Sequence, residues 1–195
     1  MIATDSFAER TFTRSEVDRM ENAGEFAGLR YELIEGRLVN KMGQSPQHRW
    51  SLYEIRLFLA SVFEFRRILT QSPVEAAEVD AHRNLPEPDV AVLIESKPEY
   101  FVRHPRGDEL LLAVEVADSS LLFDLTTKAA LYARARIPEY WVLDLSGRAL
   151  AVHRQPEAGT YRSIARLTEA ENVSPQSCSE ARIGVSALLP GKKPA

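Results

Sequence analysis

The densest concentration of apolar residues lies in segment 110–145, which reads LLLAVEVADSSLLFDLTTKAALYARARIPEYWVLDL. Residues 110–116 and 140–145 are apolar runs of strand length, and residues 121–136 between them have the composition of a helix. A strand, a helix and a second strand in that order predict a crossover unit with two parallel strands in a buried sheet. The first strand contains Glu115, and a buried carboxylate is costly unless something binds it.

Two more elements of a buried core precede this unit. Segment 48–67 is predicted to be a helix with one buried face, and segment 90–94 a buried strand with Asp89 at its entry. Segment 74–79 is a weaker strand candidate, and the polar segment 95–109 reads as a loop. The helix prediction rests on the spacing of five apolar residues: Leu52, Ile55, Leu59, Val62 and Phe63.

Shorter elements are predicted towards both ends. Thr13 and Glu16 have the spacing of a capping box, which predicts a short helix to about Asn22. Segment 31–41, YELIEGRLVNK, reads as a hairpin that turns at Glu35-Gly36. Towards the carboxyl end, a second hairpin and a short final strand are predicted over 148–154, 161–167 and 182–185.

Length and composition favour a single domain over residues 1–195, because 45% of the residues are hydrophobic and no linker is visible. We expect an N-terminal helix and hairpin at about 13–41, a core at about 48–145 and a C-terminal hairpin at about 148–167. The chain has one cysteine, Cys178, no apolar signal region and no run near the roughly 20 residues that span a bilayer. These features predict a soluble, cytoplasmic protein without a membrane partner.

The net charge of −4 argues against a general nucleic-acid coat protein, which is usually basic. It leaves room for an enzyme with a local basic groove around an acidic metal site. Such a groove and an ordinary solvated surface are both open interpretations of five basic residues: Arg66, Arg67, Arg103, His104 and Arg106.

Two acids and a lysine have positions that suit phosphodiester hydrolysis. Asp89 and Glu115 belong to two apolar strands that are expected to be neighbours, and Lys128 lies on the helix that follows. Carboxylates that converge can hold Mg²⁺, and a cation nearby offsets the charge of the transition state. The alternatives are a strand-end cap for Asp89 and a surface ion pair of Lys128 with Asp124, four residues earlier.

Several pieces of the chain, taken in order, resemble the Uma2 family of restriction endonucleases, a branch of the PD-(D/E)XK nuclease superfamily. The pieces are YELIEGRLVNKM, the histidine at position 48, PEPDVAVL, HPRGDELLLAVEVADSSL, D-x-x-x-K-x-x-L-Y-A and IPEYWVLDL. The resemblance implies an α/β fold with a restriction-endonuclease-like core, a central mixed β-sheet flanked by helices, and additional N- and C-terminal hairpins.

The resemblance also implies roles for individual residues. Asp89 and Glu115 would be catalytic acids that hold Mg²⁺ or Mn²⁺, and Lys128 would replace the superfamily lysine, whose usual position is Ala117. Glu32 would be a further catalytic acid. The alternative is that Glu32 is an exposed acid on the polar face of the hairpin. His48 and Asp124 would be neighbours of the site. The family commonly has glycine where this chain has Arg136, so we expect its helix to end differently.

The function implied is a metal-dependent DNA endonuclease that works as a homodimer, because two sites are needed to cut both strands of a duplex. A catalytically silent nucleic-acid-binding or interaction module on the same fold is the alternative, since fold does not fix function.

Overall fold

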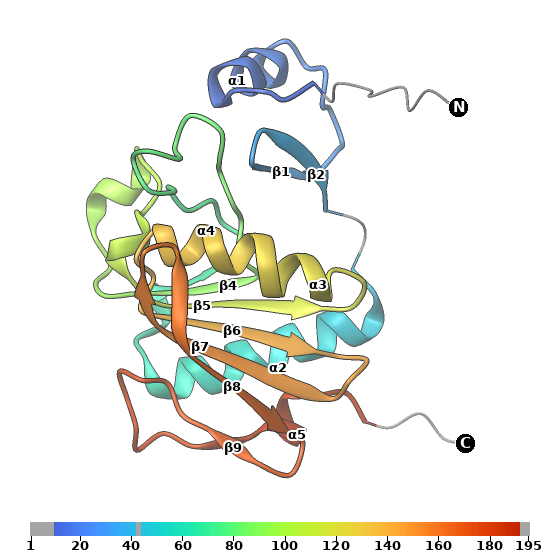
Figure 1. Ribbon diagram of the computed structural model, residues 1–195, viewed down its shortest axis with the longest axis vertical. Coiled ribbons are helices and arrows are strands. Elements are labelled where there is room, and N and C mark those ends of the chain that lie inside the picture. The colour runs from blue at the N-terminus through green and yellow to red at the C-terminus, as the bar shows by residue number, and fades with distance from the viewer. Residues whose placement is uncertain (1–9, 42–43, 192–195) are drawn as a thin grey trace, which may run out of the picture.

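The computed structural model describes residues 10–41 and 44–191. Its centre is a six-stranded mixed sheet with the strand order β3-β4-β5-β6-β7-β8 (Figure 1). All neighbouring strands are antiparallel except β5 and β6, which are parallel, so the predicted crossover unit is confirmed. The strands are β3 (Ile68–Thr70), β4 (Val90–Leu93), β5 (Leu110–Ala117), β6 (Glu139–Asp144), β7 (Ala149–Glu157) and β8 (Thr160–Thr168).

Helices cover both faces of this sheet, as expected for a sheet whose central strands are buried. One face carries α2 (Pro46–Val62), and the other carries a continuous helical segment made of α3 (Leu121–Phe123), η4 (Asp124–Lys128) and α4 (Ala129–Arg134) (Figure 1). Alternate residues of β5 face the two layers: Val114 packs with the α2 side and Ala113 with the α4 side. The fold class predicted from the sequence is therefore confirmed.

The remaining elements lie around this core. A separate two-stranded sheet is formed by β1 (Tyr31–Ile34) and β2 (Arg37–Asn40), near α1 (Arg14–Asn22), and β9 (Asn172–Val173) pairs with β10 (Ile183–Gly184). Short helical turns are η1 (Phe65–Arg67), η2 (Pro98–Phe101), η3 (Gly107–Glu109) and α5 (Val185–Leu188), the last of which packs on α2. Within the described residues, no helix is both long and apolar enough to cross a membrane.

The predicted helix cap and hairpin turn near the N-terminus are both confirmed. Thr13 and Glu16 form the capping box that begins α1, with each side chain bonded to the backbone of the other residue. Glu35 and Gly36 both have positive φ angles, 50° and 76°, in the turn of the first hairpin. Two successive positive φ angles are typical of the turn that matches the twist of a two-residue hairpin.

Four details of the secondary structure differ from the prediction. The long helix ends at Val62 rather than near residue 67, because Phe63 becomes extended and keeps its ring in the core. Segment 74–79 makes one isolated bridge, from Glu75, and no strand. The C-terminal hairpin is not separate, since β7 pairs with β6 and extends the central sheet. Strands β3 and β9 were not predicted, as each is only two or three residues long.

The end of α4 also differs from the prediction. Arg136 has a φ angle of 62°, and the amides of Arg136 and Ile137 donate to the carbonyls of Ala133 and Tyr132. These bonds form the common left-handed helix end, which favours glycine, so the expected different ending is wrong.

We expect the substitution Arg136→Gly to stabilise the protein by roughly 0.5–1 kcal/mol. Glycine adopts the left-handed conformation without the steric cost that arginine bears, and this gain exceeds its larger entropy when unfolded. Urea denaturation of both proteins measures the difference. A less stable variant would mean that the Arg136 side chain contributes more than its backbone conformation costs.

Candidate metal and phosphodiester site

The register of two strands brings the predicted acids together. Val90 of β4 pairs with Val114 of β5, so Asp89, one residue before Val90, lies opposite Glu115, one residue after Val114. The amide of Val116 donates to Asp89 Oδ2 over 2.9 Å. This bond fixes the Asp89 carboxylate to the neighbouring strand beside Glu115. Both carboxylates are almost fully buried.

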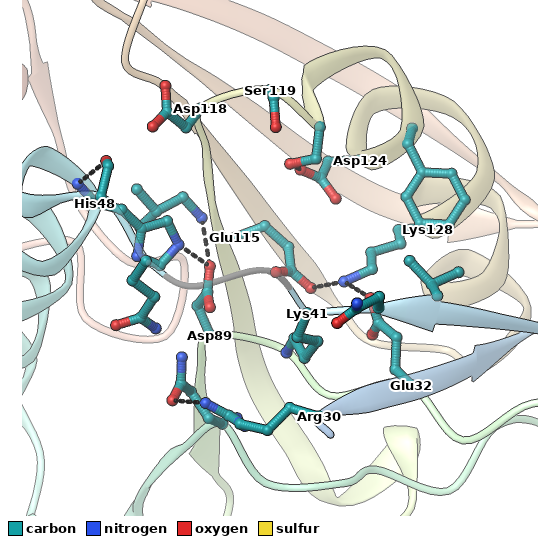
Figure 2. Close-up of a pocket in the computed structure, with 18 residues that line it drawn as sticks. Arg30, Glu32, Lys41, His48, Asp89, Glu115, Asp118, Ser119, Asp124 and Lys128 are labelled. Carbon is teal, nitrogen blue, oxygen red and sulfur yellow. Dashed lines mark hydrogen bonds and ion pairs between the residues drawn. The ribbon is translucent and has the colours of Figure 1, made fainter. Parts of the chain in front are cut away.

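Asp89 is held in its charged form. Its Oδ2 also lies 3.1 Å from Nε2 of His48, which stands in the first turn of α2 (Figure 2). Burial alone would raise the pKa of Asp89, but the bonds and charge of His48, the charge of Lys41 and the amide of Val116 lower that pKa to about 2. The serine cap of α2 positions His48, since Ser45 Oγ accepts a bond from the His48 amide.

Glu115 is bound by two donors from the helical segment on the other face. Lys128 Nζ and the hydroxyl of Tyr132 each donate to Glu115 Oε1 over 2.9 Å. Lys128 Nζ also lies 2.8 Å from Oε1 of Glu32, whose Oε2 accepts the amide of Glu87. Lys128 thus joins Glu32 of the hairpin to Glu115 of the sheet (Figure 2).

The buried location of Glu32 and Lys128 rules out two of the simpler interpretations. Glu32 is 4% exposed and Lys128 is 3% exposed, so neither an exposed hairpin acid nor a surface ion pair with Asp124 describes them. Burial alone would lower the pKa of Lys128, but the charges of Glu115 and Glu32 raise it above its usual value. Lys128 is therefore a fixed ammonium group at neutral pH.

A π-helical turn directs Lys128 inwards. The amide of Ala129 bonds to the carbonyl of Asp124 five residues earlier, which widens η4 between α3 and α4. Asp124 and Lys128, at the ends of this turn, are both buried. Ser120 stands before the segment, but its hydroxyl donates to the Asp124 carboxylate and caps no amide. π-Turns are frequent at functional sites.

The carboxylates of Asp89, Glu115 and Asp124 line one pocket and repel one another, and Lys128 offsets this repulsion only in part. Burial raises the pKa of Glu115, which Asp89 and Asp124 raise further and Lys128 lowers. Burial also raises the pKa of Asp124 to about 6, against the effects of Lys128 and Ser120. A bound cation would relieve the electrostatic repulsion between these carboxylates.

The raised pKa of Asp124 makes a prediction about stability. A carboxyl whose folded pKa exceeds its unfolded value of 3.8 stabilises the fold below pH 4, and this contribution is lost as the pH rises through about 6. We therefore expect Asp124→Asn to be more stable than the wild type at pH 8, by up to about 3 kcal/mol, and equally stable near pH 4.

Thermal unfolding in the presence of a chelator at both pH values tests this expectation. Asp118→Asn, which removes an exposed carboxylate from the same pocket, is the control and should change the melting temperature little. Equal melting temperatures of Asp124→Asn and wild type at pH 8 would show that the buried charge is not destabilising.

All six residues singled out from the sequence line one pocket of about 360 Å³: Glu32, His48, Asp89, Glu115, Asp124 and Lys128. Sequence reasoning missed Arg30 and Lys41, the other two cations of that pocket, although Lys41 lies in the YELIEGRLVNKM piece. It also missed Tyr132, whose i,i+4 spacing from Lys128 was the available signal.

The five basic residues considered for a groove do not line this pocket. Arg67 donates to the carbonyl of Leu93, and Arg103 is paired with Glu109 and Glu99. Of the two open interpretations, an ordinary solvated surface therefore fits these residues better than a basic groove around this pocket.

Comparison with known proteins gives the family and the fold of the chain. A family model for Uma2, described as "Putative restriction endonuclease", matches residues 14–186. The chain belongs to the Uma2 family. No curated protein matched the sequence at a significant level.

A solved structure shares the Uma2 fold of this chain. It is described as a putative nuclease belonging to DUF820 from Anabaena variabilis ATCC 29413 and superposes with a TM-score of 0.62 at 17% identity. The match covers 81% of this chain and 88% of the other. In the Uma2 chain described here, four of the family-like pieces carry Glu32, Asp89, Glu115 and Lys128 to the same pocket.

Proposed function

We propose that this Uma2 protein is a divalent-metal-dependent DNA endonuclease. Asp89 and Glu115 are the metal ligands, for Mg²⁺ or Mn²⁺, and Lys128 and Glu32 complete the catalytic group. The observation that carries the proposal is the buried Lys128 ammonium group, held 2.9 Å from Glu115 in a pocket that also contains Asp89. A buried cation between carboxylates is costly to maintain and is typical of a functional site.

The donor set suits magnesium. Both hydrogen bonds of the Asp89 carboxylate go to Oδ2, and both of the Glu115 carboxylate go to Oε1. Among the described residues, Asp89 Oδ1 and Glu115 Oε2 therefore accept no hydrogen bond. No group of three or more acidic, histidine or cysteine side chains poised for a metal occurs within the described residues. Mg²⁺ is commonly held by one or two carboxylates, with water and substrate phosphate as its other ligands.

The residues of the pocket divide the work between them. When bound, the metal ion supplies polarisation of the phosphate and a water of lowered pKa. Lys128, fixed by Glu32, presents a cation that orients the attacking water and offsets the charge that develops on the phosphate. Tyr132 holds Glu115 in place, and burial raises the pKa of its hydroxyl so that it remains a donor. Lys41 and Arg30 line the pocket and suit the phosphates on either side of the scissile bond.

A catalytically silent DNA-binding module is the second candidate. It is favoured by the buried Ala117 at the usual position of the superfamily lysine and by the engagement of Lys128 with two carboxylates. Such a module would bind DNA through Lys41 and Arg30 without cutting it.

Cleavage of supercoiled plasmid by the purified protein separates the two candidates. The endonuclease is expected to nick or cut plasmid with Mg²⁺ or Mn²⁺, to be inactive with a chelator and to be inactive as Asp89→Ala. Retained DNA binding without cleavage under every metal condition would favour the silent module and would overturn the proposal.

A further inference from the structure

Helix α2 has a second apolar face that points away from the sheet. Its inward face packs on the core through Leu52, Ile55 and Leu59. Its outward face carries three large apolar side chains that are more than half exposed: Trp50 (52%), Tyr53 (59%) and Leu57 (56%). Single exposed apolar residues are ordinary, but an aligned group of large ones marks an interaction surface.

Helical geometry arranges these residues as one stripe. At about 100° per residue, positions 46, 50, 53, 57 and 60 fall within one narrow sector, with alternating spacings of four and three. Pro46 and Ala60, the outer members of the stripe, are exposed as well. This spacing is that of a helix that packs against another helix along its length.

Opposite charges flank the two sides of this stripe. The same angular arithmetic puts Arg49 and Arg56 along one side, and Glu54 with Ser61 along the other. When two identical helices pack in parallel around a two-fold axis, the arginine side of each faces the glutamate side of its partner, and Arg49 meets Glu54 twice. Antiparallel packing would instead place arginine against arginine.

We propose that α2 is the dimer interface of this protein and that its occupant is α2 of a second copy, packed in parallel. The parallel arrangement follows from the charge pattern. It also has a consequence for the pocket, because His48 in the first turn of α2 lines it. A two-fold axis parallel to the helices puts both first turns, and therefore both pockets, at the same end of the dimer.

Two pockets on one end can meet the two strands of one duplex. This functional part of the inference rests on the proposed endonuclease activity, whereas the interface itself does not. Its tests therefore measure association without DNA, so that a failed interface and a failed nuclease give different results.

Sedimentation equilibrium measures the association directly. The wild type is expected to be a dimer at roughly micromolar concentration, and Leu57→Glu is expected to weaken the dimer at least about a hundredfold. The circular dichroism spectrum and the melting temperature of Leu57→Glu should match those of the wild type at a concentration where the wild type is monomeric, since the side chain is exposed. A wild type that stays monomeric at roughly 100 µM, or a Leu57→Glu dimer of unchanged affinity, would overturn the interface.

Charge exchange tests the parallel orientation. Arg49→Glu alone and Glu54→Arg alone should each weaken the dimer by about tenfold, and the double exchange should restore its affinity. Arg83→Glu, an exposed reversal outside α2, is the matched control and should leave the affinity unchanged. In antiparallel packing Arg49→Glu would strengthen the dimer instead, and that result would overturn the parallel arrangement.

A cross-link gives a second test of orientation. In a Cys178→Ser background, Leu57→Cys should form an intermolecular disulfide under mild oxidation, because parallel packing brings position 57 next to its own copy. Antiparallel packing would bring position 57 close to position 50, so Leu57→Cys mixed with Trp50→Cys would then give the heterodimer and little homodimer.

Discussion

Replacement of Glu115 by glutamine is expected to reduce plasmid cleavage at least about a thousandfold, since several kcal/mol of transition-state stabilisation are lost with a metal ligand. Glutamine keeps the size of the side chain and can still accept the hydroxyl of Tyr132, but it lacks the charge that holds the cation. The fold should tolerate this change, because burial and the neighbouring acids already raise the pKa of Glu115. Lys128 would keep its pairing with Glu32.

Cleavage rates and calorimetric Mg²⁺ titrations of the same preparations test this expectation. Glu115→Gln should melt close to the wild type and bind Mg²⁺ much more weakly. Glu95→Gln, which neutralises an exposed acid outside the pocket, should match the wild type in both assays. Equal Mg²⁺ affinity of Glu115→Gln and wild type would remove Glu115 from the site, whatever the cleavage rate.

The sequence predicted the positions of Asp89 and Glu115 for a simple physical reason. An acid inside or at the entry of an apolar strand is conspicuous, and neighbouring strands bring such residues together. The register that places the two residues opposite each other is a tertiary property, which the pattern of each strand alone does not contain.

Residues whose burial depends on long-range packing were harder to predict. The pattern of the first hairpin allowed Glu32 to be exposed, because its burial depends on Lys128, which is 96 positions later in the chain. The pattern around Asp124 and Lys128 fits an ordinary helix, and no residue in it predicts the π-turn that buries both side chains. Arg30 and Lys41 were missed because they lie just outside the ends of the hairpin strands, where a cation usually faces solvent.

Predictions from local sequence preferences failed where burial in the core determines the backbone conformation. Phe63 continued the helical spacing of α2, yet its ring is buried only because the backbone leaves the helix there. Arg136 occupies a left-handed position that glycine prefers, since the Schellman bonds and the burial of Ile137 determine the local backbone. In both cases burial of an apolar side chain, that of Phe63 itself or that of Ile137 next to Arg136, outweighs a local preference of roughly 1–2 kcal/mol.

Lys128→Ala is expected to cut turnover by about a hundredfold or more, as removal of a cation from the reacting centre costs several kcal/mol. Removal of a lysine at the surface would change the melting temperature little, because an exposed ion pair contributes at most about 1 kcal/mol. The structure changes that expectation, because removal of Lys128 would leave Glu32 and Glu115 buried without their shared cation. Loss of one partner of a buried pair typically costs about 3–5 kcal/mol of stability. Urea denaturation and single-turnover cleavage should therefore both change.

A second variant separates the catalytic effect of the Glu32–Lys128 pair from its effect on the fold. In Glu32→Gln/Lys128→Met one carboxylate and the ammonium group disappear together, so most of the stability should return. Turnover should stay low, because the cation proposed to orient the attacking water is then missing. Lys128→Arg should also cleave poorly, since a planar guanidinium does not replace a compact ammonium group between two carboxylates. If the stabilised double variant cleaves like the wild type, Lys128 only holds the hairpin to the sheet, and the cation for the reaction must come from Lys41.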